Sequence, residues 1–440
     1  MEKFFKMCVA TFVLATMLVG FVACSGSVDH KKLNSMLNTS LTMNTTDAKL
    51  IYSKSSVRSR SDANGDGYFK LTFNNEEDHV VLQDADGTPL DVCFDLERLS
   101  NRHLLVRPYF DPRYFYNGDF EEIKGEPEGD ELYRKCYELN RRRLLDVTTG
   151  KSYFWVDENE YSLGEGDIRQ CYEMSSTKYL ILTAFEIFIM DYSNPDRIKI
   201  TPVKAEGETV KTDKVEFDQF GNVAYWSETM YMWRIRTADG KYYQVDENRD
   251  RWQEMFVLND SFFLFNPEKL QLFIIGINDD TSDLTYELID FPFMNSDDVK
   301  IGLAMFNPIR QSVIFNCESP SIGTRHYEFF GNINDMHPVV LPDNIYTKFT
   351  HDKTKGKGLF GIGREKILYL NFEDLQFNEY PLTDVQITEH SIDNINGIVY
   401  FTGFSLTNGG KVMGSVNHKG ETYFKAFDDH DNITTLIPIN

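Results

Sequence analysis

Apolar residues in this chain occur in short runs that are separated by polar turns rich in Gly, Asn and Asp. Runs such as Tyr179–Thr183, Ser261–Phe265 and Lys366–Leu370 lack strict alternation, which is typical of strands buried on both faces. Tyr68–Phe73 does alternate and predicts a half-buried strand. No long segment repeats apolar residues at helical spacing, so we predict an all-β fold.

Three strand–turn–strand segments resemble one another. They are Leu144–Asn159, Thr237–Asn248 and Asn417–Phe427. Their turn glycines lie 90 residues apart (150 to 240) and 180 residues apart (240 to 420), which is two and four units of about 45 residues. A four-stranded propeller blade has this length, so we predict a β-propeller of about seven blades, with six or eight also possible. The first and last strand segments could share a blade.

We predict three parts: a signal peptide at 1–23, a flexible tether at 24–60 and a β-propeller at 61–440. The tether is rich in Ser, Thr, Asn and Lys, with room for a short helix at His30–Leu37. An irregular insertion at about 98–131 interrupts the repeat. An alternative that stays open is an N-terminal β-sandwich followed by a smaller propeller, divided at this insertion.

The N-terminus has the pattern of a secretory leader. Lys3 and Lys6 precede an apolar run at 7–22 that is short for a membrane span. The run ends at Val22, Ala23 and Cys24, which resembles the lipobox of bacterial lipoproteins. This resemblance implies lipidation of Cys24, and Ser25 after it is compatible with delivery to the outer membrane. Ordinary signal-peptide cleavage, or a buried core helix, are the alternatives.

The charge of the chain limits its possible partners, and the spacing of its cysteines limits its possible metal sites. The chain has 45 basic and 68 acidic residues, a formal net charge of −23, which argues against nucleic acid or an anionic membrane surface as a partner. Four cysteines follow the leader, namely Cys93, Cys136, Cys171 and Cys317. None forms a Cys-x-x-Cys pair, so a zinc site has no support. Cys136 and Cys171 could form a disulfide, or the thiols could be free and buried.

The turn at Asp146–Lys151, followed by Trp155, resembles the repeat of quinoprotein-type propellers. In such turns the Asp accepts hydrogen bonds from the turn backbone, Gly150 takes the positive φ, and the aromatic residue packs between blades. The motif also recurs in non-enzymatic propellers. It therefore implies the fold, and we expect no quinone or other cofactor.

Catalytic and metal-binding motifs are scarce. Asp62, Asn64 and Asp66 resemble the start of a calcium loop, but Lys70 and Phe73 stand where further ligands are expected, and a polar turn explains the same residues. The nine His residues form no His-x-His or His-Glu-x-x-His pattern, and no Gly-x-Ser-x-Gly is present. We predict no metal site and assign no catalytic residue.

The aromatic part of the insertion is the best candidate for partner binding, because long loops on a regular scaffold often carry binding residues. The candidate residues are Tyr109, Phe110, Tyr114, Phe115 and Tyr116. We therefore expect a lipid-anchored, non-enzymatic envelope protein that binds a protein or glycan partner. By fold and anchor it is similar to the propeller lipoprotein of the outer-membrane barrel-assembly machinery.

The alternative function is a propeller enzyme, a lyase or glycosidase that acts on polysaccharide. Carboxylates clustered with His or Tyr at the central funnel would favour the enzyme. A funnel lined by Ser, Thr and apolar residues would argue against it.

The lipidation hypothesis makes a direct prediction. Cys24→Ala should abolish metabolic labelling with a fatty acid and release the protein from the membrane fraction, because the acylated thiol is the only predicted anchor. Labelling and cell fractionation of wild type and variant measure both effects. A variant that labels and fractionates like wild type would show that Cys24 is not the anchor.

Overall fold

The computed structural model describes residues 26–38, 40–56, 67–154, 168–246, 253–278, 283–290, 300–320, 323–332, 336–341, 356–428 and 431–439. Two compact units can be distinguished. The smaller unit is drawn from Met1–Thr46, Val81–Glu97 and His103–Phe154, and the larger from Asp47–Val80, Arg98–Arg102 and Trp155–Asn440. No helix in the described ranges is long and apolar enough to cross a membrane.

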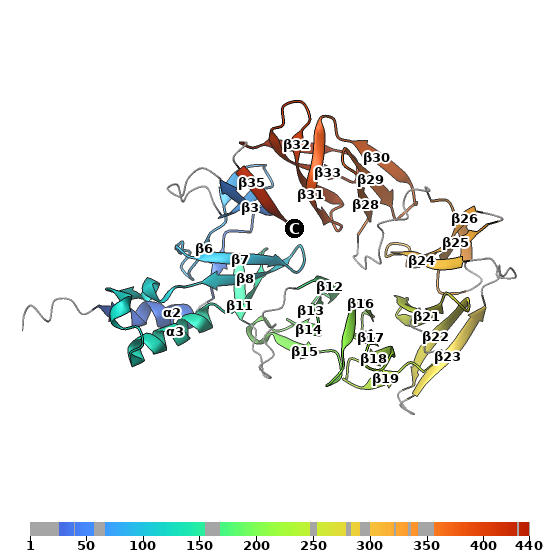
Figure 1. Cartoon of the computed structure of the whole chain (residues 1–440), viewed down its shortest axis with the longest axis horizontal. Helices are drawn as coiled ribbons and strands as arrows, with labels where there is room; N and C mark the ends of the chain where they lie inside the picture. The colour runs from blue at the N-terminus through green and yellow to red at the C-terminus, as the bar shows by residue number, and fades with distance from the viewer. Residues whose placement is uncertain are drawn as a thin grey trace, which may run out of the picture. The chain divides into compact units, whose positions relative to one another are not determined.

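The larger unit contains seven antiparallel sheets, six of which follow one another along the chain (Figure 1). The first has β12 (Gln170–Ser175), β13 (Lys178–Leu182), β14 (Ile187–Asp191) and β15 (Lys199–Pro202), with the short 3-10 helix η3 (Pro195–Arg197) before β15. The second has β16 (Val210–Phe217), β17 (Val223–Ser227), β18 (Met232–Arg236) and β19 (Tyr242–Gln244). The third has β20 (Glu254–Leu258), β21 (Ser261–Asn266), β22 (Gln271–Asn278) and β23 (Asp283–Asp290).

The next three sheets repeat the same up-and-down order. They are β24 (Lys300–Asn307), β25 (Ser312–Ser319), β26 (Gly323–Phe329) and β27 (Met336–Val339); β28 (Gly358–Ile362), β29 (Lys366–Asn371) and β30 (Phe377–Pro381); and β31 (Val385–Asp393), β32 (Ile398–Ser405), β33 (Lys411–Asn417) and β34 (Thr422–Ala426). In each sheet the chain runs from the first strand to the last without a crossover. Short turns are therefore sufficient to connect the strands.

The seventh sheet joins the two ends of the chain. Its order is β35 (Asp431–Pro438), β3 (Ala48–Ser56), β4 (Gly67–Thr72) and β5 (Glu77–His79). β3 and β35 are antiparallel, with Ile51 opposite Ile437. The expectation that the first and last strands share a blade is therefore confirmed.

Six hydrophobic clusters connect these seven sheets, each cluster lying between two neighbours. Between the second and third sheets, Trp226 and Trp233 pack with Phe262 and Phe273. Between the third and fourth, the ring of Phe315 meets that of Phe265 edge-on, with centroids 5.4 Å apart. Because both faces of the inner sheets are covered, central strands such as β13, β17 and β21 are almost wholly buried, which explains the apolar runs in the sequence.

The three repeated turns connect corresponding pairs of strands in their sheets. Gly150, Gly240 and Gly420 have φ of +68°, +89° and +82°. Gly240 and Gly420 connect the third and fourth strands of their sheets (β18–β19 and β33–β34), and Gly150 connects β10 (Arg143–Asp146) to β11 (Lys151–Phe154). The Asp146 carboxylate accepts hydrogen bonds from the backbone N–H and the hydroxyl of Thr148, at 2.9 and 2.6 Å, as the turn motif predicts.

The smaller unit has a six-stranded sheet with helices. The sheet order is β6 (Leu82–Gln83), β2 (Thr42–Met43), β11, β10, β8 (His103–Tyr109) and β7 (Cys93–Arg98). The other elements are β1 (Ser27–Val28), paired with β9 (Tyr116–Asn117), the helices α2 (His30–Asn38) and α3 (Pro127–Leu139), and the 3-10 helices η1 (Pro112–Phe115) and η2 (Phe120–Glu122).

The predicted tether at 24–60 contains regular structure, so its boundary is corrected. The expected short helix is α2, whose Leu33 and Met36 are buried, and β3 is part of the closing sheet. The insertion at 98–131 likewise holds β8, β9, η1, η2 and the start of α3. The pairing partner of β3 lies at the opposite end of the sequence, so no local pattern indicated its role.

Taken together, the described residues form an all-β β-propeller of about eight blades. The predicted fold class is therefore confirmed. Seven sheets belong to the larger unit, and the sheet of the smaller unit brings the number to eight. This count is one more than the seven that the repeat favoured and lies within the predicted range.

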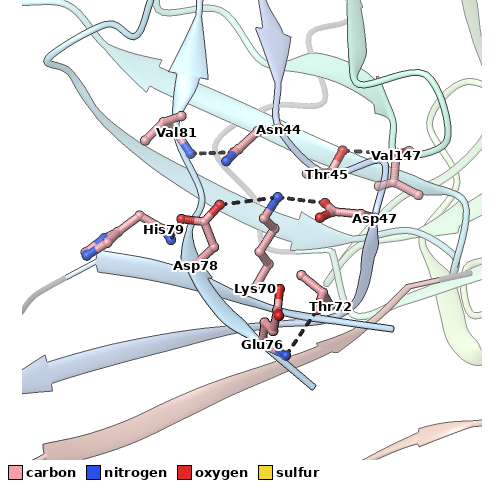
Figure 2. Close-up of polar contacts among 10 residues, drawn as sticks. All are labelled: Asn44, Thr45, Asp47, Lys70, Thr72, Glu76, Asp78, His79, Val81 and Val147. Carbon is pink, nitrogen blue, oxygen red and sulfur yellow. Dashed lines mark hydrogen bonds and ion pairs between the residues drawn. The ribbon is translucent and has the colours of Figure 1, made fainter. Parts of the chain in front are cut away.

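A buried lysine holds the closing sheet together. Lys70 on β4 is almost fully buried, and its ammonium lies 2.6 Å from Asp47 and 3.5 Å from Asp78 (Figure 2). The N–H of Glu76 donates to the Thr72 hydroxyl at 3.1 Å in the turn between β4 and β5. Two carboxylates around one buried cation satisfy its charge and fix the segment before β3 against β4 and β5.

A second ionic group joins the closing sheet to the sheet before it. Glu77 on β5 accepts hydrogen bonds from Lys425 on β34, from Tyr52 and, at 3.1 Å, from Lys54. Loss of water contact alone would raise the pKa of Glu77, but these hydrogen bonds outweigh it and lower the pKa to about 2 from an ordinary value of 4.5.

This group predicts a pH dependence of stability. A carboxylate whose pKa is lower in the folded than in the unfolded state stabilises the fold above about pH 4.5, and the contribution disappears as pH falls through about 2. Glu77→Gln should therefore cost on the order of 1 kcal/mol near pH 6, and less as the pH approaches 2. Denaturant unfolding across this range measures the effect, and Glu76→Gln is the matched control. Equal, pH-independent losses in both variants would contradict the prediction.

Candidate functional site

The predicted partner-binding aromatics lie between β8 and β9 in the smaller unit. Asp111 begins the 3-10 helix η1: its carboxylate accepts a hydrogen bond from the N–H of Arg113 at 2.8 Å, and Pro112 follows at the first helical position. This short helix turns the chain sharply. As a result, successive aromatic side chains point in different directions.

The five predicted residues separate into a buried and an accessible set. Phe110, Phe115 and Tyr116 are buried, and the rings of Phe110 and Phe115 lie 5.8 Å apart. Tyr114 is partly covered, with the Lys32 ammonium 3.7 Å from its ring centre. Tyr109 is exposed. Of the five, Tyr109 therefore presents the largest surface to a partner.

Helix α3 contributes two tyrosines that sequence reasoning missed. Its apolar stripe, Leu132, Cys136 and Leu139, is buried. Tyr133 and Tyr137 each follow a stripe residue by one position and are exposed. The spacing of four residues places both rings on one face of the helix. The spacing of these tyrosines is visible in the sequence, but it indicates a shared face only if 127–139 is treated as a helix.

These residues line a groove of about 620 Å³, which we call the tyrosine groove. Its lining residues are Tyr109, Phe110, Asp111, Pro112, Tyr133, Arg134, Cys136, Tyr137 and Asn140. Phe110 and Cys136 are buried, and burial raises the pKa of the Cys136 thiol to about 12, which makes this thiol unreactive. The groove combines apolar and polar groups.

Two of the groove tyrosines are held in place by their neighbours. The Tyr109 hydroxyl donates a hydrogen bond to Asp95, and this bond, with a smaller effect of burial, raises the pKa of Tyr109. The Tyr133 ring meets Phe120 edge-on, with centroids 5.2 Å apart. The Asn140 side chain bonds both the N–H and the carbonyl of Phe110, at 2.6 and 3.1 Å. The groove is therefore ordered before a partner arrives.

The larger unit contains a second hollow, of about 630 Å³, which we call the first-strand cavity. It is formed by β12, β16, β20 and β24, the first strands of four consecutive sheets, by the turns that follow β16, β20 and β24, and by Val313 of β25. Its polar lining residues are the carboxylates Glu173, Glu216, Asp218 and Asp260 and the amides Gln219, Asn259 and Gln311. The rest are apolar, namely Met174, Phe217, Phe256, Val257, Leu303, Phe306, Pro308, Ile309 and Val313.

The remaining predicted sites have different outcomes. Cys24 and the Asp62–Asn64–Asp66 loop lie outside the described residues. The possible disulfide between Cys136 and Cys171 is not formed, and neither Cys93 nor Cys317 is in a disulfide. Within the described ranges, no three His, Cys, Asp or Glu side chains converge closely enough to hold a metal ion.

Comparisons with known proteins assign neither a family nor an activity to this chain. No family model and no curated protein matches the sequence. Similar solved structures include an oligogalacturonate lyase from Vibrio parahaemolyticus, with 11% identity, a TM-score of 0.39 and coverage of 87% of this chain and 98% of that one. A quinoprotein alcohol dehydrogenase-like protein from Bacteroides thetaiotaomicron has 9% identity, a TM-score of 0.37 and coverage of 91% and 95%. TolB from Acinetobacter baumannii has 11% identity, a TM-score of 0.29 and coverage of 80% and 83%.

At these identities and TM-scores the neighbours assign no activity to this chain, and its β-propeller fold rests on its own sheets.

The division of the aromatic residues into buried and exposed predicts losses of stability of different size. Phe110→Ala should cost about 3–5 kcal/mol, because it leaves a cavity beneath the groove. Tyr109→Ala removes an exposed ring and should cost about 1 kcal/mol or less. Chemical denaturation of both variants measures the difference. Similar losses in the two would mean that Tyr109 is as much a structural residue as Phe110.

Proposed function

We propose that this protein is a non-enzymatic binding module of a bacterial cell envelope, anchored in the outer membrane through lipid on Cys24. We further propose that it holds a protein partner in the tyrosine groove. The observation that carries the proposal is the set of three exposed tyrosines around one preformed groove. Tyr109, Tyr133 and Tyr137 are 41%, 44% and 73% exposed.

Exposed tyrosines with ordered rings favour binding for a physical reason. A tyrosine supplies a large apolar surface and a polar tip, and it loses little conformational entropy because it has few rotatable bonds. Holding Tyr109 by Asp95 and Tyr133 by Phe120 reduces that loss further.

The composition of the groove favours a protein over a glycan. Tyrosine and arginine are the residues that most often carry the binding energy of protein interfaces, and Arg134 lies among the tyrosines. Arg134 and Asp111 also place both signs of charge at the groove, which suits the mixed charges of a protein surface.

The polysaccharide-enzyme alternative has less support. It expected carboxylates together with His or Tyr at the central funnel. The lining of the first-strand cavity has carboxylates and amides, and neither His nor Tyr is among its described residues. This lining includes four carboxylates and neither Lys nor Arg, which does not favour an acidic polysaccharide.

Site-specific photo-cross-linking in the native host tests the proposal. A photoreactive residue at Tyr137 should form a discrete adduct with one envelope protein, whereas the same residue at Tyr231, an exposed tyrosine of the larger unit, should not. Tyr133→Ala should weaken the interaction by about 30-fold, the effect of losing an interface residue worth about 2 kcal/mol.

Two results would contradict the proposal. Identical adducts at Tyr137 and Tyr231 would indicate non-specific contact. The absence of a protein adduct, together with binding of envelope glycans that Tyr133→Ala abolishes, would identify a glycan as the partner.

A further inference from the structure

The first-strand cavity is a second site, separate in sequence and structure from the tyrosine groove. Each of four consecutive sheets contributes the end of its first strand to the cavity. Three of these sheets also contribute the turn that follows that strand. Its volume of about 630 Å³ lies within the range of small-ligand sites, about 300–1,000 Å³.

The cavity carries negative charge that none of its other lining residues offsets. Glu216 and Asp218 are buried, with 8% and 3% of their surface exposed, and Glu173 and Asp260 are exposed. The lining contains no Lys, Arg or His.

Asp218 accepts four hydrogen bonds from neutral donors. One carboxylate oxygen accepts from the N–H groups of Phe220, Gly221 and Asn222, at 3.0, 2.9 and 2.9 Å, and the other accepts from the Asn222 amide at 2.6 Å. Burial raises the pKa of Asp218, and these hydrogen bonds oppose that rise. The turn holds the carboxylate in position without cancelling its charge.

The other walls are apolar and extend to the surface. Phe217, Phe256 and Phe306 line the cavity, and Ile309, also in the lining, is 51% exposed. Phe220, next to the lining residue Gln219, is 63% exposed. Exposed apolar side chains beside a cavity are typical of a binding surface.

These features distinguish between kinds of ligand. An anion would be repelled by the carboxylates. A bare metal ion would leave the aromatic walls unused, and the described residues hold no cluster of metal ligands. A ligand with a positive nitrogen and an apolar body satisfies both the charge and the walls.

We propose that the first-strand cavity binds an organic cation with an apolar body. This chemistry has two sources, a Lys or Arg side chain flanked by apolar residues in a peptide, and a free aromatic amine. The site is independent of the proposed partner at the tyrosine groove.

Isothermal titration calorimetry of the full-length protein in detergent tests the proposal. The probes are acetyl-Leu-Lys-Phe-amide, its Glu counterpart acetyl-Leu-Glu-Phe-amide, and phenethylamine. The Lys peptide should bind at least about 10-fold more tightly than the Glu peptide, and its affinity should fall as salt is raised. Phenethylamine binding as tightly as the Lys peptide would identify free amines as the source, and weaker binding would identify peptides.

Charge-neutralising variants locate the site. Glu216→Gln and Asp260→Asn should each weaken the Lys peptide by about 10-fold, whereas Glu287→Gln, which removes an exposed charge from β23 of the third sheet, should change it by less than about 2-fold. Asp260 has φ of +60°, which Asn tolerates, so this variant should fold even if Glu216→Gln does not.

Three outcomes would overturn the proposal. They are failure of the wild type to bind both the Lys peptide and phenethylamine, equal binding of the Lys and Glu peptides, and an equal loss in Asp260→Asn and Glu287→Gln. None of them bears on the tyrosine groove, because Tyr133→Ala should leave cation binding unchanged.

Discussion

Burial of sheet faces against neighbouring sheets is the constraint on which this structure depends. An antiparallel sheet of four short strands cannot bury its own side chains, so each sheet of the larger unit relies on the next one. The six clusters between the seven sheets are built largely from aromatic and branched residues, such as Trp226, Phe265 and Phe401. The first strands are fixed by this packing, and their ends form the first-strand cavity.

A series of sheets has a first and a last member. In this protein one sheet contains strands from both ends of the chain. The pairing of β3 with β35 commits the N-terminal and C-terminal segments to the same sheet. Lys70 secures the segment before β3 within the sheet, and Glu77 connects it to Lys425 of the preceding one. Ionic groups lie at this junction, whereas the clusters between the other sheets are largely apolar.

The two candidate sites are held in shape by different kinds of contact. The tyrosine groove gains its order from local contacts, a capped 3-10 helix and a helix with its apolar stripe turned inward. The first-strand cavity gains its order from repetition, because equivalent strand ends from four sheets converge on one hollow. We propose a macromolecular partner for the first and a small charged group for the second.

The sequence by itself determined the fold class, the position of most strands and the repeating turn. These follow from local rules: apolar runs specify buried strands, and Asp146 with Gly150 specifies a turn whatever surrounds it. Only the tertiary structure decided which aromatic residues of the insertion are accessible, because Tyr109 and Phe110 are adjacent in sequence and opposite in burial. It alone also brought Glu216 and Asp260 to one cavity and paired β3 with β35, since contacts between distant segments leave no periodic signal in either segment.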